Sequence, residues 1–128
     1  MRQNDMPAAD LTYRIIGLAM QVHRQLGPGL LESVYEKCLC YELTQAAIPF
    51  QRQAPLAVHY GDVLLESGCV ADIIVDNQVV LELKAVERML PVHEAQLLTY
   101  LRLSECRVGL LINFNTVSLT DGIKRRVL

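Results

Sequence analysis

The sequence lacks an excess of basic residues. Its 128 residues include 12 Lys and Arg against 14 Asp and Glu, for a formal net charge of −2 and an isoelectric point near 5.9. Such a chain has no bulk positive field to attract nucleic acid. Any nucleic-acid function must therefore rest on a local site. Lysine is the scarcer cation, with only Lys37, Lys84 and Lys124.

Long apolar runs and paired cysteine motifs are also missing. No stretch approaches the roughly 18–20 apolar residues that a membrane span needs, and residues 1–7 lack the apolar core of a signal peptide. No C-x-x-C pair occurs among the four cysteines, which are Cys38, Cys40, Cys69 and Cys106. We therefore expect reduced thiols in a cytoplasmic protein that contacts no membrane, rather than a zinc site.

Enough apolar material is present for one folded domain. Hydrophobic residues make up 52% of the chain and charged residues 20%, a balance that excludes disorder. The length suits a single domain, and no linker, repeat or low-complexity stretch divides it. We expect a flexible N-terminal segment over residues 1–9 and one domain over residues 10–128.

Hydrophobic periodicity predicts three helices and five strands. The helices are expected over residues 10–26, 30–47 and 91–104, and the strands over 55–60, 63–65, 69–75, 79–86 and 107–114. Gly27 is expected to end the first helix in a left-handed conformation. The tail beyond residue 116 is expected at a sheet edge. The order α-α-β-β-β-β-α-β predicts an α/β domain with a central mixed sheet flanked by helices.

Three charged residues interrupt two apolar strands. Asp72 lies within the strand 69–75, and Glu82 and Lys84 point to one face of the strand 79–86. Burying an unpaired charge costs several kcal/mol, so these groups must be paired or must bind something. Lys84 could form a structural ion pair with a carboxylate, or one strand could be a wet edge. For all three together we favour a metal-binding or catalytic cluster.

Polar residues also lie on two helices. Glu32 shares a stripe with Tyr35 and Leu39, although for Glu32 taken alone favourable helix-end electrostatics would be the better explanation. In the third helix, Gln96 aligns with His93 and Tyr100, three residues before it and four after it. This ridge is polar where the neighbouring face is apolar.

These motifs resemble those of a known superfamily. Asp72, nine further residues and then Glu82-x-Lys84 resemble the D…(D/E)-x-K signature of the PD-(D/E)XK nucleases, with Ala71 in place of the nominal proline. The segment 29–35, Gly-Leu-Leu-Glu-Ser-Val-Tyr, resembles the element that names the GxxExxY branch. The segment 96–100 resembles the Q-x-x-x-Y helix of exonuclease-like members. The likeness covers residues 11–126.

The resemblance implies a restriction-endonuclease-like fold and a metal-dependent nuclease, with DNA as the expected nucleic acid. Glu32, Asp72 and Glu82 would hold Mg²⁺ or Mn²⁺, and hard oxygen ligands suit these ions independently. Lys84 would hold the attacking water or stabilise charge on the phosphate. In the third helix, Gln96 would orient a water or the substrate, and Tyr100 would position Gln96 or contact the backbone.

Weaker substrate contacts are expected from Tyr35, Arg88 and His93. Because duplex binding usually draws on several cations, the acidity of the chain weighs against an active nuclease; the evident candidates are Arg52, Arg88 and the basic run 124–126. Two alternatives stay open: a non-catalytic nuclease fold that acts as a binding or dimeric interaction module, and a small-molecule hydrolase. A second copy of the chain or another protein stays open as a partner.

Strand register decides whether Asp72 and Glu82 can share a site. A two-residue turn after Val75 would put them on opposite faces, whereas a three-residue loop over 76–78, or a bulge, would pair Val75 with Val79 and bring them together. Turn chemistry slightly favours the short turn. Two lone carboxylates on separate apolar faces would cost several kcal/mol. We therefore predict the odd-length loop or a bulge.

Overall fold

Helices and strands account for most of the chain over residues 7–128, which a computed structural model describes. The elements are α1 (Ala9–Leu26), α2 (Glu32–Gln45), β1 (Phe50–Tyr60), β2 (Val63–Val75), β3 (Val79–Lys84), α3 (Pro91–Ser104), β4 (Val108–Asn113), the short 3₁₀ helix η2 (Leu119–Gly122) and β5 (Ile123–Val127). A flexible segment was expected over residues 1–9, of which residues 1–6 lie outside the described residues. Helix α1 already includes Ala9.

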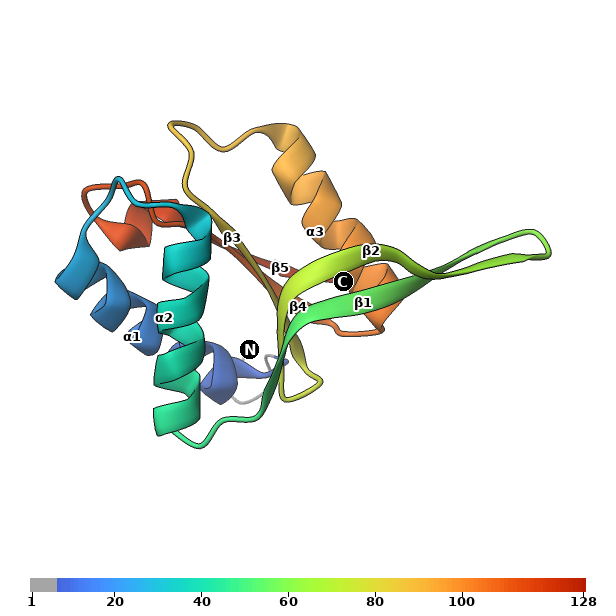
Figure 1. The fold of residues 1–128 in the computed structure, drawn as a ribbon, viewed down its shortest axis with the longest axis horizontal. Coiled ribbons are helices and arrows are strands. Elements are labelled where there is room, and N and C mark those ends of the chain that lie inside the picture. The colour runs from blue at the N-terminus through green and yellow to red at the C-terminus, as the bar shows by residue number, and fades with distance from the viewer. Residues whose placement is uncertain (1–6) are drawn as a thin grey trace.

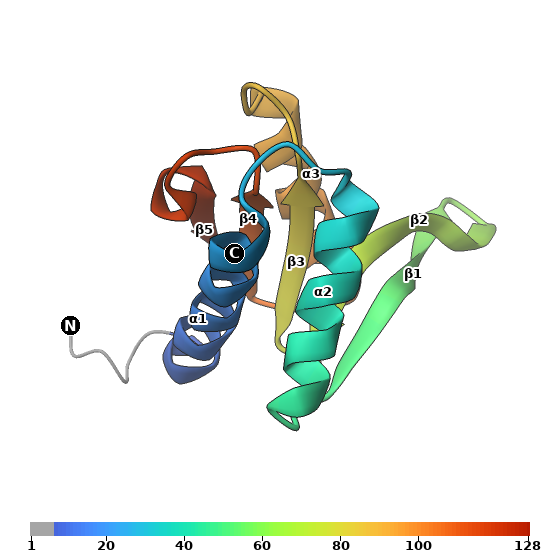
Figure 2. The same cartoon turned by 60° about the vertical axis from the view of Figure 1, so that its left-hand side comes forward.

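The strands form one sheet in the order β1-β2-β3-β4-β5, in which β3 and β4 are parallel and the other neighbours antiparallel. Helices α1 and α2 cover one face of the sheet and α3 covers the other (Figures 1 and 2). The predicted α/β domain with a mixed sheet flanked by helices is confirmed. None of the described helices has both the length and the apolar content to cross a membrane.

The predicted element order needs one correction. The two strands expected at 63–65 and 69–75 are one strand, β2, so three strands rather than four separate α2 from α3. Strand β2 pairs with β1 on both sides of an irregularity, where Val58 lies opposite Leu65 and Leu56 opposite Cys69. A Cβ atom on Gly68 would come within 2.4 Å of Val58, so glycine lets the strands pass closely and continue. The tail forms the edge strand β5, as expected.

The outer parts of β1 and β2 project from the body as a two-stranded arm, residues 57–68 (Figure 1). Tyr60, Val63, Leu64 and Leu65 are all exposed on this arm. The inner parts of both strands lie between the helical layers. The arm therefore extends the sheet beyond the two apolar cores.

Each face of the sheet has its own core. One cluster joins α1 and α2 to residues such as Ile73 and Leu81, and the second joins α3 to residues such as Ala71 and Val80. Burying such side chains supplies roughly 1.5–3 kcal/mol each for the larger ones. The two clusters show on which face of the sheet each of their strand residues lies.

The loop between α1 and α2 is tied down by Tyr35. Gly27 ends α1 at φ 68°, the left-handed conformation expected for it. The Tyr35 hydroxyl donates to the Gly27 carbonyl at 2.5 Å and accepts from the Leu30 N–H at 3.2 Å, and its ring stacks on Phe114 at 4.5 Å. We expected a weak substrate contact from Tyr35. Its side chain is fully buried, so its contacts instead join the loop to the core.

We expect Tyr35→Phe to lower the free energy of unfolding by about 1–2 kcal/mol, because the Gly27 carbonyl and the Leu30 N–H lose their shared partner. The matched control is Tyr41→Phe on the same helix, where the ring is 62% exposed and a change within about 0.5 kcal/mol is expected. Urea unfolding measures both. Equal effects of the two substitutions would contradict the role given to the Tyr35 hydroxyl.

Candidate functional site

Strands β2 and β3 pair in the predicted register. Val75 lies opposite Val79 and Ile74 opposite Val80, which leaves a three-residue loop over 76–78 and confirms the odd-length prediction. Asp76 and Asn77 both have positive φ values, 51° and 53°, and the Gln78 N–H donates to the Val75 carbonyl at 2.9 Å. Asp76 and Asn77 therefore adopt the left-handed conformation that a two-residue turn would need. Gln78 is the third residue of the loop and makes its length odd.

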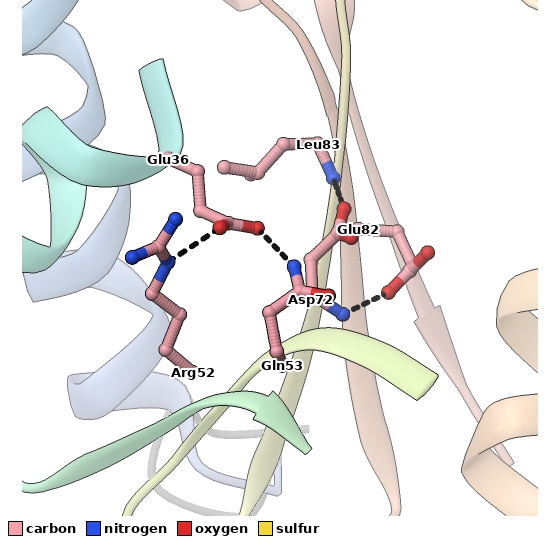
Figure 3. Close-up of polar contacts among 6 residues, drawn as sticks. All are labelled: Glu36, Arg52, Gln53, Asp72, Glu82 and Leu83. Carbon is pink, nitrogen blue, oxygen red and sulfur yellow. Dashed lines mark hydrogen bonds and ion pairs between the residues drawn. The ribbon is translucent and has the colours of Figure 1, made fainter. Parts of the chain in front are cut away.

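Two carboxylates span the point where β2 and β3 separate. The ladder ends at Ile73 and Leu81. Beyond it, the Asp72 N–H donates to Glu82 Oε2 at 2.7 Å, and the Leu83 N–H donates to Asp72 Oδ2 at 2.8 Å (Figure 3). Each side chain thus accepts a hydrogen bond from the backbone of the opposite strand. We refer to Asp72 and Glu82 as the carboxylate pair.

Strand β2 is kinked at the same place. The β1–β2 ladder skips the position where Gln53 would meet Asp72, and Gln53 has φ 51°. Ala71 packs in the core beside α3, whereas Ile73 packs in the core beside α1 and α2. Regular alternation would put these two residues on one face. The kink therefore places Asp72 at a change of face, beside β3 but no longer in its ladder.

Sequence reasoning missed Glu36, which lies next to the pair. This α2 residue is 6% exposed and accepts hydrogen bonds from Arg52 Nε at 2.6 Å and from Gln53 Nε2 at 2.8 Å (Figure 3). Its negative charge raises the pKa of Asp72. The signal was present in the sequence, because Glu36 follows Glu32 by four residues and so lies on the same side of the helix.

Burial perturbs the acidity of both members of the pair. Burial, followed by the charge of Asp72, raises the pKa of Glu82 to about 8, against the opposing effects of the Asp72 N–H and Lys84. Burial also raises the pKa of Asp72; Glu36 and Glu32 act in the same direction, and the Leu83 N–H and Lys84 oppose them. With no cation bound, Glu82 therefore holds a proton near neutral pH.

Lys84 leads into a polar row on α3. Its Nζ donates to Gln96 Oε1 at 3.5 Å, a long contact, and Gln96 Nε2 donates to the Tyr100 hydroxyl at 3.1 Å. The predicted ridge of Gln96 and Tyr100 therefore faces the strand that carries Lys84. Over residues 7–128 the ion pairs are Arg52–Glu36 and Arg126–Glu94. Lys84 takes part in neither, so it acts on the carboxylate pair through its charge and not as a direct ion-pair partner.

Asn113, also missed, holds the end of β3 next to Lys84. It lies opposite Lys84 in the β3–β4 ladder and is 3% exposed. Its side chain accepts from the Val86 N–H at 3.1 Å and donates to the Val86 carbonyl at 2.9 Å. A lone amide in the apolar strand 108–113 is the same kind of signal as Asp72 in its strand. These bonds position the chain as it leaves the site, although β3 ends at Lys84 and not at Val86 as predicted.

The remaining predicted residues lie further out. Glu32 is exposed in the first turn of α2, and its charge is the weakest of those acting on the pair. Arg88 is exposed in the segment between β3 and α3. His93 is half-buried, and its Nδ1 accepts the Leu90 N–H at 3.0 Å, which caps the start of α3. The observed contact of His93 is therefore local to its helix.

The carboxylate pair offers donors of the kind that Mg²⁺ and Mn²⁺ prefer. Each carboxylate uses one oxygen for a backbone N–H, and its second oxygen accepts no hydrogen bond from residues 7–128. Hard oxygen donors and an incomplete protein shell suit Mg²⁺, which keeps several waters. Within the same described range, no three His, Cys, Asp or Glu side chains are grouped closely enough to hold a metal. The predicted set of Glu32, Asp72 and Glu82 is thus not gathered into one cluster.

The family model of the PD-(D/E)XK nuclease superfamily matches residues 9–126 of the chain. The chain therefore belongs to this superfamily, and the mixed sheet with helices on both faces is consistent with that fold. A comparison with curated proteins finds no match, and neither does one with solved structures.

We expect the metal-free protein to become less stable as the pH rises from about 5 to about 8. The pKa of Glu82 is about 8 in the folded state against an ordinary value of 4.5. Between these values the folded state holds a proton that the unfolded state has lost, so stability falls by up to about 1.4 kcal/mol per pH unit.

Melting temperatures in EDTA across this range measure the effect. Glu82→Gln should remove most of the decline and should raise the melting temperature at the alkaline end. Glu66→Gln, in the exposed part of β2, should follow the wild type. A Glu82→Gln protein with the wild-type pH dependence would show that another group titrates.

Proposed function

We propose that the protein hydrolyses phosphodiester bonds of nucleic acid, with DNA as the substrate, in a reaction that depends on Mg²⁺ or Mn²⁺. The observation that carries the proposal is the carboxylate pair at the separation of β2 and β3, where each side chain is held by a backbone N–H and keeps a second oxygen open. Membership in the nuclease superfamily supports it. We also infer that the chain belongs to the GxxExxY branch, because Gly29 in the loop before α2 is followed by Glu32 and Tyr35 in the first turn of that helix.

Asp72 and Glu82 would hold the cation, and Glu32 would join through a water or by moving its exposed side chain. When bound, the cation polarises the phosphodiester and makes a bound water more acidic. Because Glu82 holds a proton near neutral pH, loading the site requires that proton to leave. Binding should therefore strengthen as the pH rises toward 8.

Lys84 would act on the reacting group. Lys84 is half-buried, its charge acts on both carboxylates, and its Nζ makes only a long contact with Gln96. It is therefore available to orient the attacking water or to stabilise negative charge that develops on the phosphate. Gln96 would hold a water or the substrate, with its amide oriented by Tyr100. The pKa of Tyr100 is raised, chiefly by burial, so its hydroxyl stays protonated in this role.

The compartment is part of the proposal. All four cysteines are free. Free thiols support a reducing compartment, and we propose the cytoplasm.

Mg²⁺ or Mn²⁺ should raise the melting temperature of the wild type. At a concentration 100-fold above the dissociation constant, binding stabilises a protein by about 2.7 kcal/mol, or roughly 10 °C for a domain of this size. Asp72→Asn should abolish the rise. Asp76→Asn, the same substitution in the hairpin loop at φ 51°, should keep it, because Asn tolerates this conformation. A wild type indifferent to millimolar concentrations of both ions would refute the metal site.

Lys84→Ala should reduce cleavage about 100-fold or more while the fold stays intact, because charge on the reacting phosphate loses its partner. The measurement is cleavage of plasmid, linear duplex, single-stranded DNA and RNA with Mg²⁺, Mn²⁺ or EDTA. Lys37→Ala on the exposed side of α2 is the control and should cleave as the wild type does. A wild type that binds metal and nucleic acid but cleaves none of the four would support the non-catalytic alternative instead.

A further inference from the structure

Positive charge is scarce around the site. Residues 53–83 contain no Lys or Arg, and they include both members of the carboxylate pair. Glu32 and Glu36 add negative charge from α2. Lys84 on β3 acts on the carboxylate pair through its charge, and Arg52 on β1 pairs with Glu36. A polyanionic substrate must therefore approach a largely acidic surface, on which each of these two cations contributes a large share of the attraction.

Arg52 is held at one end and open at the other. Its Nε donates to Glu36 Oε2 at 2.6 Å, and its side chain is 41% exposed while that of Glu36 is 8% exposed. Its terminal guanidinium nitrogens donate no hydrogen bond to residues 7–128. Because a guanidinium has five N–H donors, four are left for a ligand. A residue that served only to neutralise Glu36 would not need this open fork.

The backbone next to Arg52 departs from regular strand geometry at Gln53. Arg52 and Gln53 are consecutive in β1, and alternation would point them to opposite faces. Both nevertheless donate to Glu36, because Gln53 adopts the left-handed conformation at φ 51°. Such a conformation costs about 1–3 kcal/mol for a residue other than glycine and is concentrated at functional sites. The same kink lies opposite Asp72, and Arg52 is linked to it through Glu36, which also accepts from Gln53 (Figure 3).

We propose that Arg52 binds a phosphate of the nucleic-acid strand next to the one that is cleaved, with Glu36 and Gln53 as its positioning residues. This inference rests on the proposed nuclease function and adds a substrate contact to it. A guanidinium fork matches the oxygens of a phosphate and binds them in pairs. Lys84 lies with Gln96 on the α3 side of the pair, whereas Arg52 lies on the α2 side. The two cations therefore contact different phosphates.

The test separates binding from chemistry. Arg52→Gln should raise KM roughly tenfold and leave kcat within about twofold, since the lost contact is to a phosphate that does not react. Binding of a labelled oligonucleotide, with Ca²⁺ in place of Mg²⁺, should lose about one unit of its slope against the logarithm of salt concentration. Arg52→Lys should restore the slope and only part of KM, because it keeps the charge without the fork.

Two further variants complete the design. Arg24→Gln removes an exposed cation from α1 and should change neither KM nor the salt slope. Glu36→Gln should raise KM and keep the slope, because Arg52 loses its orientation and not its charge. A purely structural Arg52 would instead lower the melting temperature and kcat of Arg52→Gln with KM and slope unchanged.

The outcomes for the two proposals differ. A wild type that cleaves, with Arg52→Gln equal to it in KM and salt slope, would overturn the role of Arg52 alone. A wild type that binds the oligonucleotide through Arg52 but never cleaves it would overturn the nuclease function and keep the phosphate contact. A wild type that neither binds nor cleaves would overturn both.

Discussion

Backbone hydrogen bonding at the separation of β2 and β3 is the constraint on which the rest of the structure depends. Two N–H groups, of Asp72 and Leu83, lose their ladder partners there, and a buried N–H without a partner costs about 1–3 kcal/mol. The side chains of Glu82 and Asp72 supply those partners. The groups best suited to hold a cation therefore also complete the sheet. Substitutions at either residue would disturb these bonds as well as the proposed metal site, which is why isosteric amide variants are the informative ones.

Helices on both faces of the sheet contribute polar side chains to the region around the carboxylate pair. From α2 comes Glu36, which is satisfied by two donors of β1, and from α3 comes Gln96, which meets Lys84. Within residues 7–128, neither Lys84 nor Arg52 forms a direct ion pair with Asp72 or Glu82. Protonation of Glu82 instead reduces the excess negative charge, because the pKa of Glu82 is raised to about 8. A bound divalent cation would replace that proton.

The sequence alone was sufficient for the helices, the mixed sheet and the register of β2 against β3, since each follows from periodicity or from the cost of burying charge. It was not sufficient for the continuity of β2 past Gly68, because a bulge leaves no periodic signal. The sequence marks Glu36 and Asn113 as polar residues on buried faces, but it does not reveal their partners, which are distant in sequence: Arg52 in one case and Val86 in the other. Tyr35 and His93 were singled out for their chemistry, and their observed bonds are to neighbouring backbone groups.

The arm, residues 57–68, has a consequence for how the domain opens. Its strands pair only with each other, and an isolated two-stranded hairpin is marginally stable in water. Local unfolding proceeds in cooperative units whose free energies differ across a structure. The irregularity between Leu56 and Val58 divides the ladder, so unzipping that starts at Gly61 reaches a natural stop there. The amide hydrogens of the arm can therefore exchange with solvent through local unfolding of the arm alone. The backbone at Gln53 and the hydrogen bonds between Asp72 and β3 keep their folded arrangement meanwhile.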